Sequence, residues 1–382
     1  MLLKNAVIFN EEFETVKADI LTEADRISAV GMVENAANES VFDLTGMTIL
    51  PGFIDMHIHG CANADVGDAA PDTLETMSAN LVKHGVTSFC PTSMTLSLEL
   101  LQTVFANVRD TMNDVSGAYV QGINMEGPYI AMSKRGAQNP AYVRNPDKDE
   151  FRRLYDECGG IVRVVDIAPE CEGGLEFIRE VSAYCPVAIA HTAADYDEAK
   201  SAIEAGAGVV THLYNAQSGL AHREPGVVGA AFDMAKSHNV YCELICDGHH
   251  IHPAALRIAF SQVGEDHSVI VSDSCEGADC PDGEYEIGGQ KIFVRDGLAR
   301  LESGTIAAST SNLHQELKNV ISYGVPVKQA VKSVSINPAK AIRVDHETGS
   351  IAVGKRADLV VVDADWNIKM VIVRGEIKVN NL

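Results

Sequence analysis

Between residues 51 and 344, short apolar runs alternate with longer amphipathic stretches, and this alternation constrains the fold more than any other feature. We predict strands at 88–90, 119–123, 161–167, 187–190, 209–211, 242–246 and 269–271, with helices between them at 72–84, 147–158, 194–205 and 254–264. Such alternation predicts a parallel sheet. Some eight units over roughly 300 residues favour a TIM-type (β/α)8 barrel of the α/β class. An open doubly wound sheet is the alternative, but no Gly-x-Gly-x-x-Gly motif follows an early strand.

The two ends of the chain differ from this middle part. Short strands between polar turns are predicted at 6–9, 19–21 and 26–30, and again at 358–362 and 370–373. Because strand-rich ends flank a different middle, we predict a small β-sandwich domain built from residues 1–50 and 345–382. The barrel domain would then comprise residues 51–344.

The first strand of the predicted barrel ends in two histidines. An apolar run leads through Pro51 and Gly52 to His57, Ile58 and His59. On a strand, residues i and i+2 point to the same side, so His57 and His59 present both imidazoles to one place. Two convergent imidazoles at a strand end are a reasonable start to a divalent metal site.

Later strand ends carry further residues of the same chemical kind. Glu126 follows the run at 119–124, His191 follows 187–190, His212 follows 209–211, and Asp273 follows 269–271. Active sites of such barrels lie at the carboxyl ends of the strands. Four histidines and two carboxylates at one barrel mouth match the nitrogen and oxygen ligands of a hydrolytic metal ion.

Charge and cysteine content limit the partners and the location. The formal net charge of −23 argues against nucleic acid or an anionic membrane as a partner. No apolar run approaches the ~20 residues of a membrane-spanning helix. The nine cysteines include no Cys-x-x-Cys pair, which in a chain of this length indicates reduced thiols and a cytoplasmic location. We expect Cys242, Cys246, Cys275 and Cys280 to be buried small side chains rather than ligands.

Several motifs resemble those of one enzyme family over essentially the whole chain. They are the Pro-Gly-Phe-Ile-Asp run from Pro51 with His57-x-His59-Gly60, Glu126-Gly127-Pro128, Lys134-x-Gly136-x-x-Asn139-Pro140, Thr211-His212-Leu213-Tyr214-Asn215-Ala216, Arg223-Glu224-Pro225-Gly226, Asn337-Pro338-Ala339 and the Gly-Lys-x-Ala-Asp-Leu run from Gly354. The first and last are shared by many amidohydrolases, whereas His-Leu-Tyr-Asn-Ala and Arg-Glu-Pro-Gly are more specific. Together they resemble the N-acetylglucosamine-6-phosphate deacetylase family of the amidohydrolase superfamily.

The resemblance implies a role for each matching residue. Glu126, His191 and His212 would hold one divalent ion, and His57 with His59 would hold a second, bridged by Glu126 and with Asp273 close by. Zinc or iron is the expected metal. Asp273 would serve as general base and acid. The substrate, an N-acetylated amino-sugar phosphate, would contact Gln138, Asn215, Ala216, Arg223, His250 and Ile306, with Arg223 and His250 on the phosphate. Members are typically homodimers that share residues between active sites.

Three alternatives stay open at this stage. Gln138 stands where members often have a histidine, and Ser272 and Ser274 flank Asp273 where Thr and Ala are common, so N-acetylgalactosamine 6-phosphate is another candidate substrate. A dihydroorotase or hydantoinase type of amidohydrolase usually bridges its metals with a carboxylated lysine, and Glu126 makes such a lysine unnecessary here. A non-catalytic relative would usually have lost metal ligands, yet none of the expected ligands is missing.

Overall fold

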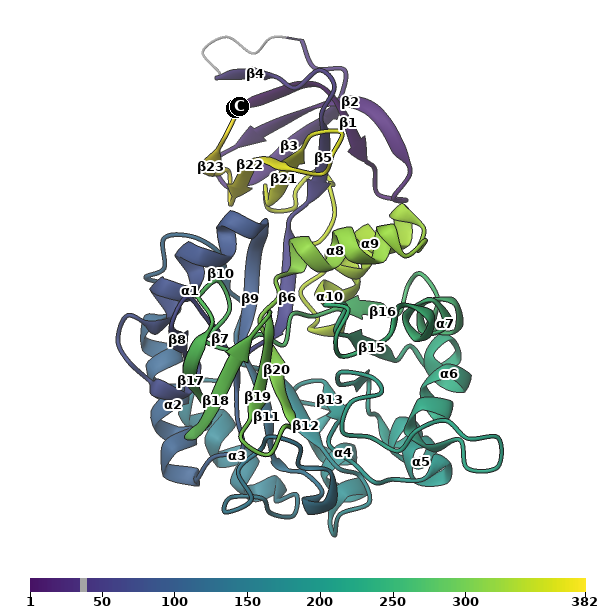
Figure 1. The fold of residues 1–382 in the computed structure, drawn as a ribbon. Coiled ribbons are helices and arrows are strands. Elements are labelled where there is room, and N and C mark those ends of the chain that lie inside the picture. The colour runs from purple at the N-terminus through teal and green to yellow at the C-terminus, as the bar shows by residue number, and fades with distance from the viewer. Residues whose placement is uncertain (35–39) are drawn as a thin grey trace.

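The computed structural model describes residues 1–34 and 40–382 and contains a parallel barrel (Figure 1). The main sheet has nine strands, and short β10 (Tyr119–Val120) pairs only with β9, which leaves eight for the barrel. The barrel strands are β6 (Phe53–Ile58), β9 (Val86–Ser93), β11 (Ile123–Tyr129), β12 (Val162–Ile167), β13 (Val187–Ile189), β14 (Val209–Val210), β15 (Tyr241–Leu244) and β16 (Ser268–Ile270). A hydrogen bond from Asp273 N to His57 O, 3.0 Å long, joins the last strand to the first.

Helices follow the barrel strands in chain order and cover the outside of the barrel. They are α1 (Thr73–Leu81), α2 (Leu98–Thr111), α3 (Lys148–Glu157), α4 (Gly174–Val181), α5 (Tyr196–Ala205), α6 (Gly226–His238) and α7 (Pro253–Val263), followed by α8 (Leu313–Ser322), α9 (Val327–Ser333) and α10 (Ile336–Ala341). Inside the barrel, Ile54, Met56, Val164 and Val269 belong to an apolar cluster that also takes in residues of α10. No helix within the described ranges is long and apolar enough to cross a membrane.

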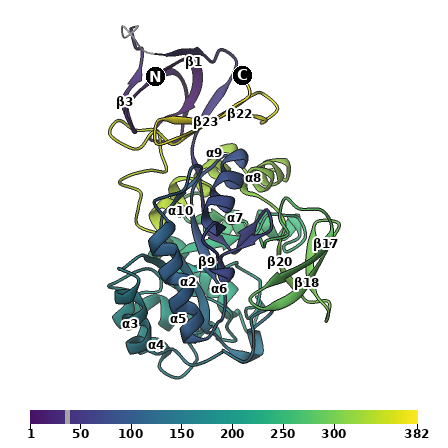
Figure 2. The same ribbon diagram turned by 90° about the vertical axis from the view of Figure 1, so that its left-hand side faces the viewer.

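The two chain ends form one sheet on top of the barrel, where Figure 2 places both termini. Its strands are β1 (Leu2–Phe9), β2 (Thr15–Glu23), β3 (Arg26–Gly31), β4 (Val41–Asp43), β5 (Thr48–Pro51), β21 (Leu359–Val362), β22 (Ile368–Val373) and β23 (Glu376–Asn380). Antiparallel pairing of β5 with β21 joins the ends, which share a separate apolar core. Residues 35–39 of the predicted small domain lie outside the described ranges.

The Pro-Gly-Phe-Ile-Asp motif marks the passage from the terminal sheet into the barrel. β5 ends at Pro51, and β6 begins at Phe53 and is buried throughout. A Cβ on Gly52 would lie 2.1 Å from Thr87 Oγ1 on the neighbouring strand, so only glycine allows the strands to approach this closely. The β6–β9 register shifts between Asp55 and Ile58, where His57 turns toward the barrel mouth.

Two features differ from the sequence predictions. The strand that carries Glu126 was expected to end at residue 124, but β11 runs to Tyr129, so the carboxylate lies within a strand and not after one; this prediction was wrong. An antiparallel sheet that is not predicted from the sequence is inserted after β16; its strands are β17 (Gly283–Ile287), β18 (Gln290–Arg295), β19 (Leu298–Leu301) and β20 (Ile306–Ser309). This sheet brings Thr305, Ile306 and Ala307 to the barrel mouth.

Candidate metal and substrate site

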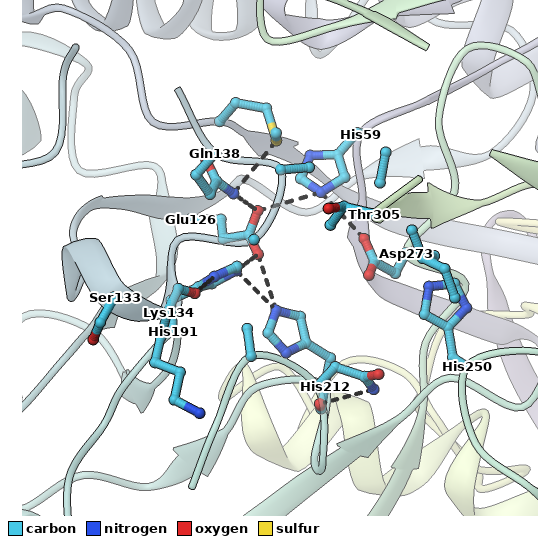
Figure 3. Close-up of a pocket in the computed structure, with 17 residues that line it drawn as sticks. His59, Glu126, Ser133, Lys134, Gln138, His191, His212, His250, Asp273 and Thr305 are labelled. Atoms are coloured by element: carbon cyan, nitrogen blue, oxygen red, sulfur yellow. Dashed lines mark hydrogen bonds and ion pairs between the residues drawn. The ribbon is translucent and has the colours of Figure 1, made fainter. Parts of the chain in front are cut away.

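Glu126 lies at the centre of the barrel mouth and faces two pairs of histidines, of which Figure 3 shows His59, His191 and His212. Its Oε1 lies 2.9 Å from His191 Nε2 and 3.1 Å from His212 Nε2. Its Oε2 lies 3.4 Å from His59 Nε2, and His57 Nε2 lies 3.7 Å from Oε1. The structure therefore brings together both triads that the sequence predicted, His57–His59–Glu126 and Glu126–His191–His212.

Asp273, which follows β16, completes the same site and lies next to His57 and His59. Its Oδ1 lies 3.2 Å from His59 Nε2 and 3.7 Å from His57 Nε2. The side chain is 11% exposed, which is more than any of the four histidines. Asp273 is thus the predicted ligand most open to the cavity, where a proton carrier has to stand.

The chemistry of these donors fits a divalent ion. His191 Nε2 and His212 Nε2 are only 3.2 Å apart and point at the same carboxylate oxygen. His57 Nε2 is buried and has no hydrogen-bond partner. Imidazole nitrogens and carboxylate oxygens arranged in this way are the donors that zinc and related ions take. The described residues could therefore hold a metal on either side of Glu126.

Three of the site residues occupy strained backbone positions. His191, His212 and Asp273 have φ angles of 42°, 28° and 46°, a left-handed region that non-glycine residues seldom adopt. Each stands two or three residues after the end of a barrel strand, and the left-handed turn directs its side chain inward. Such strain tends to persist where the surrounding structure over-determines it, as at functional sites.

Burial and the histidines act in opposite directions on the two carboxylates. Burial raises the pKa of Glu126, but its hydrogen bonds with His191 and His212 outweigh that effect and hold the pKa well below its usual value. For Asp273, burial likewise raises the pKa, while the hydrogen bond with His59 and the charge of His57 bring it below the usual value. Both groups are therefore ionised and able to serve as ligand or base.

A cavity of about 420 Å³ opens in front of the histidines and Glu126. Five of the six residues predicted to bind substrate line it, namely Gln138, Asn215, Ala216, His250 and Ile306. The Gln138 amide donates to Glu126 Oε2 at 2.5 Å, while its Oε1 accepts from Thr95 N. His250 Nδ1 lies 2.7 Å from Asp247 Oδ2, which leaves its Nε2 for a ligand.

Arg223, the sixth predicted residue, is not brought to the cavity. It is exposed in the loop between β14 and α6 and is not among the residues that line the cavity. The ion pairs of the described residues include none between Arg223 and Glu224, so the guanidinium is not paired with its neighbour.

Two residues of this region were missed by the sequence analysis. Glu243 lies within β15, fully buried, with its Oε2 3.0 Å from His57 Nδ1. A lone glutamate in the apolar run 241–246 was the available signal. Lys134 lines the cavity, and its Nζ donates to Gln217 O at 2.9 Å. It was noted only as part of a motif.

Comparison with known proteins agrees with this geometry. Residues 48–378 match the family model described as the Amidohydrolase family. The N-acetylglucosamine-6-phosphate deacetylase of Vibrio furnissii is 33% identical over 374 residues, 97% of this chain and 93% of that protein. The N-acetylgalactosamine-6-phosphate deacetylase of Escherichia coli O157:H7 is 33% identical over 341 residues, 88% of this chain and 89% of that protein.

A solved structure is similar over the full length of the chain. It is a mutant N-acetyl-D-glucosamine-6-phosphate deacetylase from Mycobacterium smegmatis, in complex with N-acetyl-D-glucosamine-6-phosphate. The two chains superpose with a TM-score of 0.93 at 32% identity, over 100% of this chain and 99% of that one. The fold predicted from the alternation of strands and helices is thereby confirmed.

Proposed function

The chain belongs to the amidohydrolase family, and we propose that it hydrolyses the acetamide of N-acetylglucosamine 6-phosphate to give glucosamine 6-phosphate and acetate. One observation carries this proposal: Glu126 stands between two histidine pairs at the floor of a cavity lined by five predicted substrate-binding residues. A divalent ion held by these residues would supply a bound water of lowered pKa and would polarise the amide carbonyl. We expect one or two ions per chain, zinc or iron.

We assign the proton transfers to Asp273. Water adds to the carbonyl carbon of the acetamide, and the Asp273 carboxylate takes one of its protons. The same carboxyl group then delivers that proton to the amide nitrogen, the C–N bond breaks, and the products are acetate and the free amine. The support for this role is the position of Asp273, between the histidines and the open cavity.

For the phosphate we propose His250 and Arg223. The pKa of His250 is lowered by burial but raised more by its hydrogen bond to Asp247, so it stands above its usual value and favours the cation. Arg223 lies outside the cavity of its own chain and is exposed. We therefore propose a homodimer in which each subunit lends Arg223 to the cavity of the other. A guanidinium fork suits phosphate oxygens.

Substitution of Arg223 tests the phosphate assignment. A hydrogen bond to a charged group is worth about 1.5–3 kcal/mol, so Arg223→Ala should lower kcat/KM for N-acetylglucosamine 6-phosphate by about 10-fold or more. The effect on N-acetylglucosamine should be small, because that substrate has no phosphate. Arg153→Ala, at an exposed arginine of α3, is the matched control. Equal losses on both substrates would show that Arg223 is structural.

Subunit mixing tests the shared site. Co-expressed Arg223→Ala and Asp273→Asn chains would form mixed dimers in which one cavity combines an intact Asp273 with an intact Arg223. That cavity should regain turnover on the phosphosugar well above the mean of the two parent variants. Activity no greater than this mean would show that Arg223 serves its own chain or none.

N-acetylgalactosamine 6-phosphate is the second candidate substrate. The similarity to the Escherichia coli enzyme of that name supports keeping it, as does Gln138, whose amide is engaged by Glu126 and Thr95. Comparing kcat/KM for the two epimers decides between them. We also keep the cytoplasm as the proposed location, since all nine cysteines lie in the described ranges as free thiols.

A further inference from the structure

Glu243 is a buried carboxylate that the proposed reaction does not use. It lies on β15 with no exposed surface, below the histidines of the site. Removing a carboxylate from water is costly unless it is paired and hydrogen-bonded. Glu243 Oε2 has two partners, His57 Nδ1 at 3.0 Å and the backbone N–H of His212 at 3.1 Å, whereas Oε1 is buried without one among the described residues.

These two contacts act on the two triads separately. An ionised carboxylate only accepts hydrogen bonds, so Glu243 fixes the His57 proton on Nδ1 when the ring acts as a ligand. His57 Nε2 is then presented, without another partner, to the space beside Glu126 and Asp273. The second contact holds the backbone at His212, where φ is 28°. A single oxygen thus joins the ligand of one triad to the main chain of the other.

Of the other three histidines, two have neutral outer partners, and His212 Nδ1 is buried without a hydrogen-bond partner among the described residues. His59 Nδ1 faces Thr92 O at 3.1 Å, and His191 Nδ1 faces Lys134 O at 2.9 Å. Two divalent ions would place a large positive charge on this floor, against the carboxylates of Glu126 and Asp273. Glu243 adds a third negative charge, and it does so on the His57 side.

We propose that Glu243 is a positioning residue that makes the site a two-ion site, by orienting His57 and balancing the charge of the second ion. The inference rests on the proposed function, which makes the barrel mouth a metal site. What it predicts is ion binding and not activity. Outer partners of metal ligands typically change metal affinity about 10–100-fold when removed. The second ion, whose ligand His57 would lose its ring partner, should therefore depend on Glu243 much more than the first, whose ligand His212 would lose only a main-chain contact.

Equilibrium dialysis of the metal-free full chain against zinc tests whether the second ion depends on Glu243. The unaltered protein should bind two ions. Glu243→Leu removes both hydrogen bonds and should weaken the second ion by about 10-fold or more while leaving the first within about 3-fold. Glu243→Gln keeps an acceptor but loses the charge, so its second ion should weaken by an intermediate factor.

Glu316→Gln is the matched control, because Glu316 is equally buried but accepts from the Cys246 backbone N–H and not from a predicted metal ligand. It should leave both affinities unchanged. A second ion bound equally well by the unaltered protein, Glu243→Leu and Glu243→Gln would overturn the inference, and so would equal weakening of both ions. If Glu243→Leu fails to fold, the comparison of Glu243→Gln with Glu316→Gln decides alone.

The outcome stays separate from the proposed function. An unaltered protein that binds two ions but releases no acetate would count against the deacetylase, not against Glu243. An unaltered protein that binds a single ion would overturn the role given to Glu243 and leave a one-ion deacetylase standing.

Discussion

His57 reaches Glu126 from the end of strand β6 and His59 from the residue just after it, whereas His191 and His212 reach it from two loops whose backbones are left-handed. The first pair is held through side-chain and carbonyl partners, Glu243 and Thr92. The second pair stands on left-handed main chain, where His191 has one carbonyl partner, Lys134 O, and the outer nitrogen of His212 has none among the described residues. Any strand can present two residues to one side, as the end of β6 does. We therefore expect small changes in sequence to be enough to remove the metal-binding ability of the β6 pair. The loop pair is specified by strained turns, and we expect it to hold the ion that catalysis requires.

Removing the loop pair should have the largest effect. His191→Ala with His212→Ala takes away two of the ligands nearest Glu126 Oε1, so tight ion binding should disappear. Turnover should fall by at least about 10³-fold, since metal activation is worth several kcal/mol. Metal analysis and acetate release are the measurements, and His238→Ala, at an exposed histidine on α6, is the control. Undiminished metal content would mean that the site has been misassigned.

Asp273→Asn should come next. The amide is nearly isosteric with the carboxylate but cannot carry the proton, and general acid–base catalysis contributes on the order of 10²–10⁴-fold. Turnover of the metal-saturated variant should fall by that factor while the ion content and the melting temperature stay near those of the unaltered protein. A near-normal rate would restrict Asp273 to the role of a ligand.

Removing the β6 pair should cost less than removing the loop pair. His57→Gln with His59→Asn should lose the second ion only, because Glu126, His191 and His212 remain. Turnover should fall roughly 10–100-fold, since the first ion and Asp273 still act. Loss of both ions in this variant would show that the two pairs are not independent, and the comparison drawn above would fail.

The smallest expected effect is a dependence of stability on pH, caused by Asp65, which lies near His59. Burial raises the pKa of Asp65 to about 7, so the folded chain keeps the proton where the unfolded chain has lost it. Stability should then fall as pH rises from 3.8 to about 7. Asp65→Asn keeps the acceptor for Gly67 N and removes the titration. Between pH 6 and 8, the stripped unaltered chain should lose about 1 kcal/mol more of its free energy of unfolding in urea than the variant, in which Asp55, another buried carboxylate of raised pKa, still titrates. Parallel pH profiles would contradict this.

The sequence predicted which side chains meet at the barrel mouth wherever their place follows directly from strand position. His57, His59, His191, His212 and Asp273 stand at or beyond strand ends, and the carboxyl ends of parallel strands meet at one mouth. That rule needs no knowledge of the loops. The prediction from sequence was wrong about the end of β11, because Glu126 reaches the same barrel mouth from within a longer strand.

What the sequence did not predict depends on contacts between distant segments. Glu243 meets His57 across 186 positions of sequence, and nothing local distinguishes it from other buried carboxylates. The β17–β20 sheet did leave a signal, since Gly288-Gly289 and Asp296-Gly297 are typical of hairpin turns. The position of Arg223 relative to the substrate cavity depends on the loop that carries it and on the proposed neighbouring subunit. Its sequence motif therefore predicted a role for Arg223 but not where it lies.

The most direct test of the account is acetate release from N-acetylglucosamine 6-phosphate by chelator-stripped protein as zinc is returned. We predict no turnover above background without metal. Activity should appear with the first equivalent, which Glu126, His191 and His212 bind, and rise further with the second, which the β6 pair binds. Turnover by fully stripped protein, or none at any zinc content, would contradict the central claim that this barrel mouth is a metal-dependent deacetylase site.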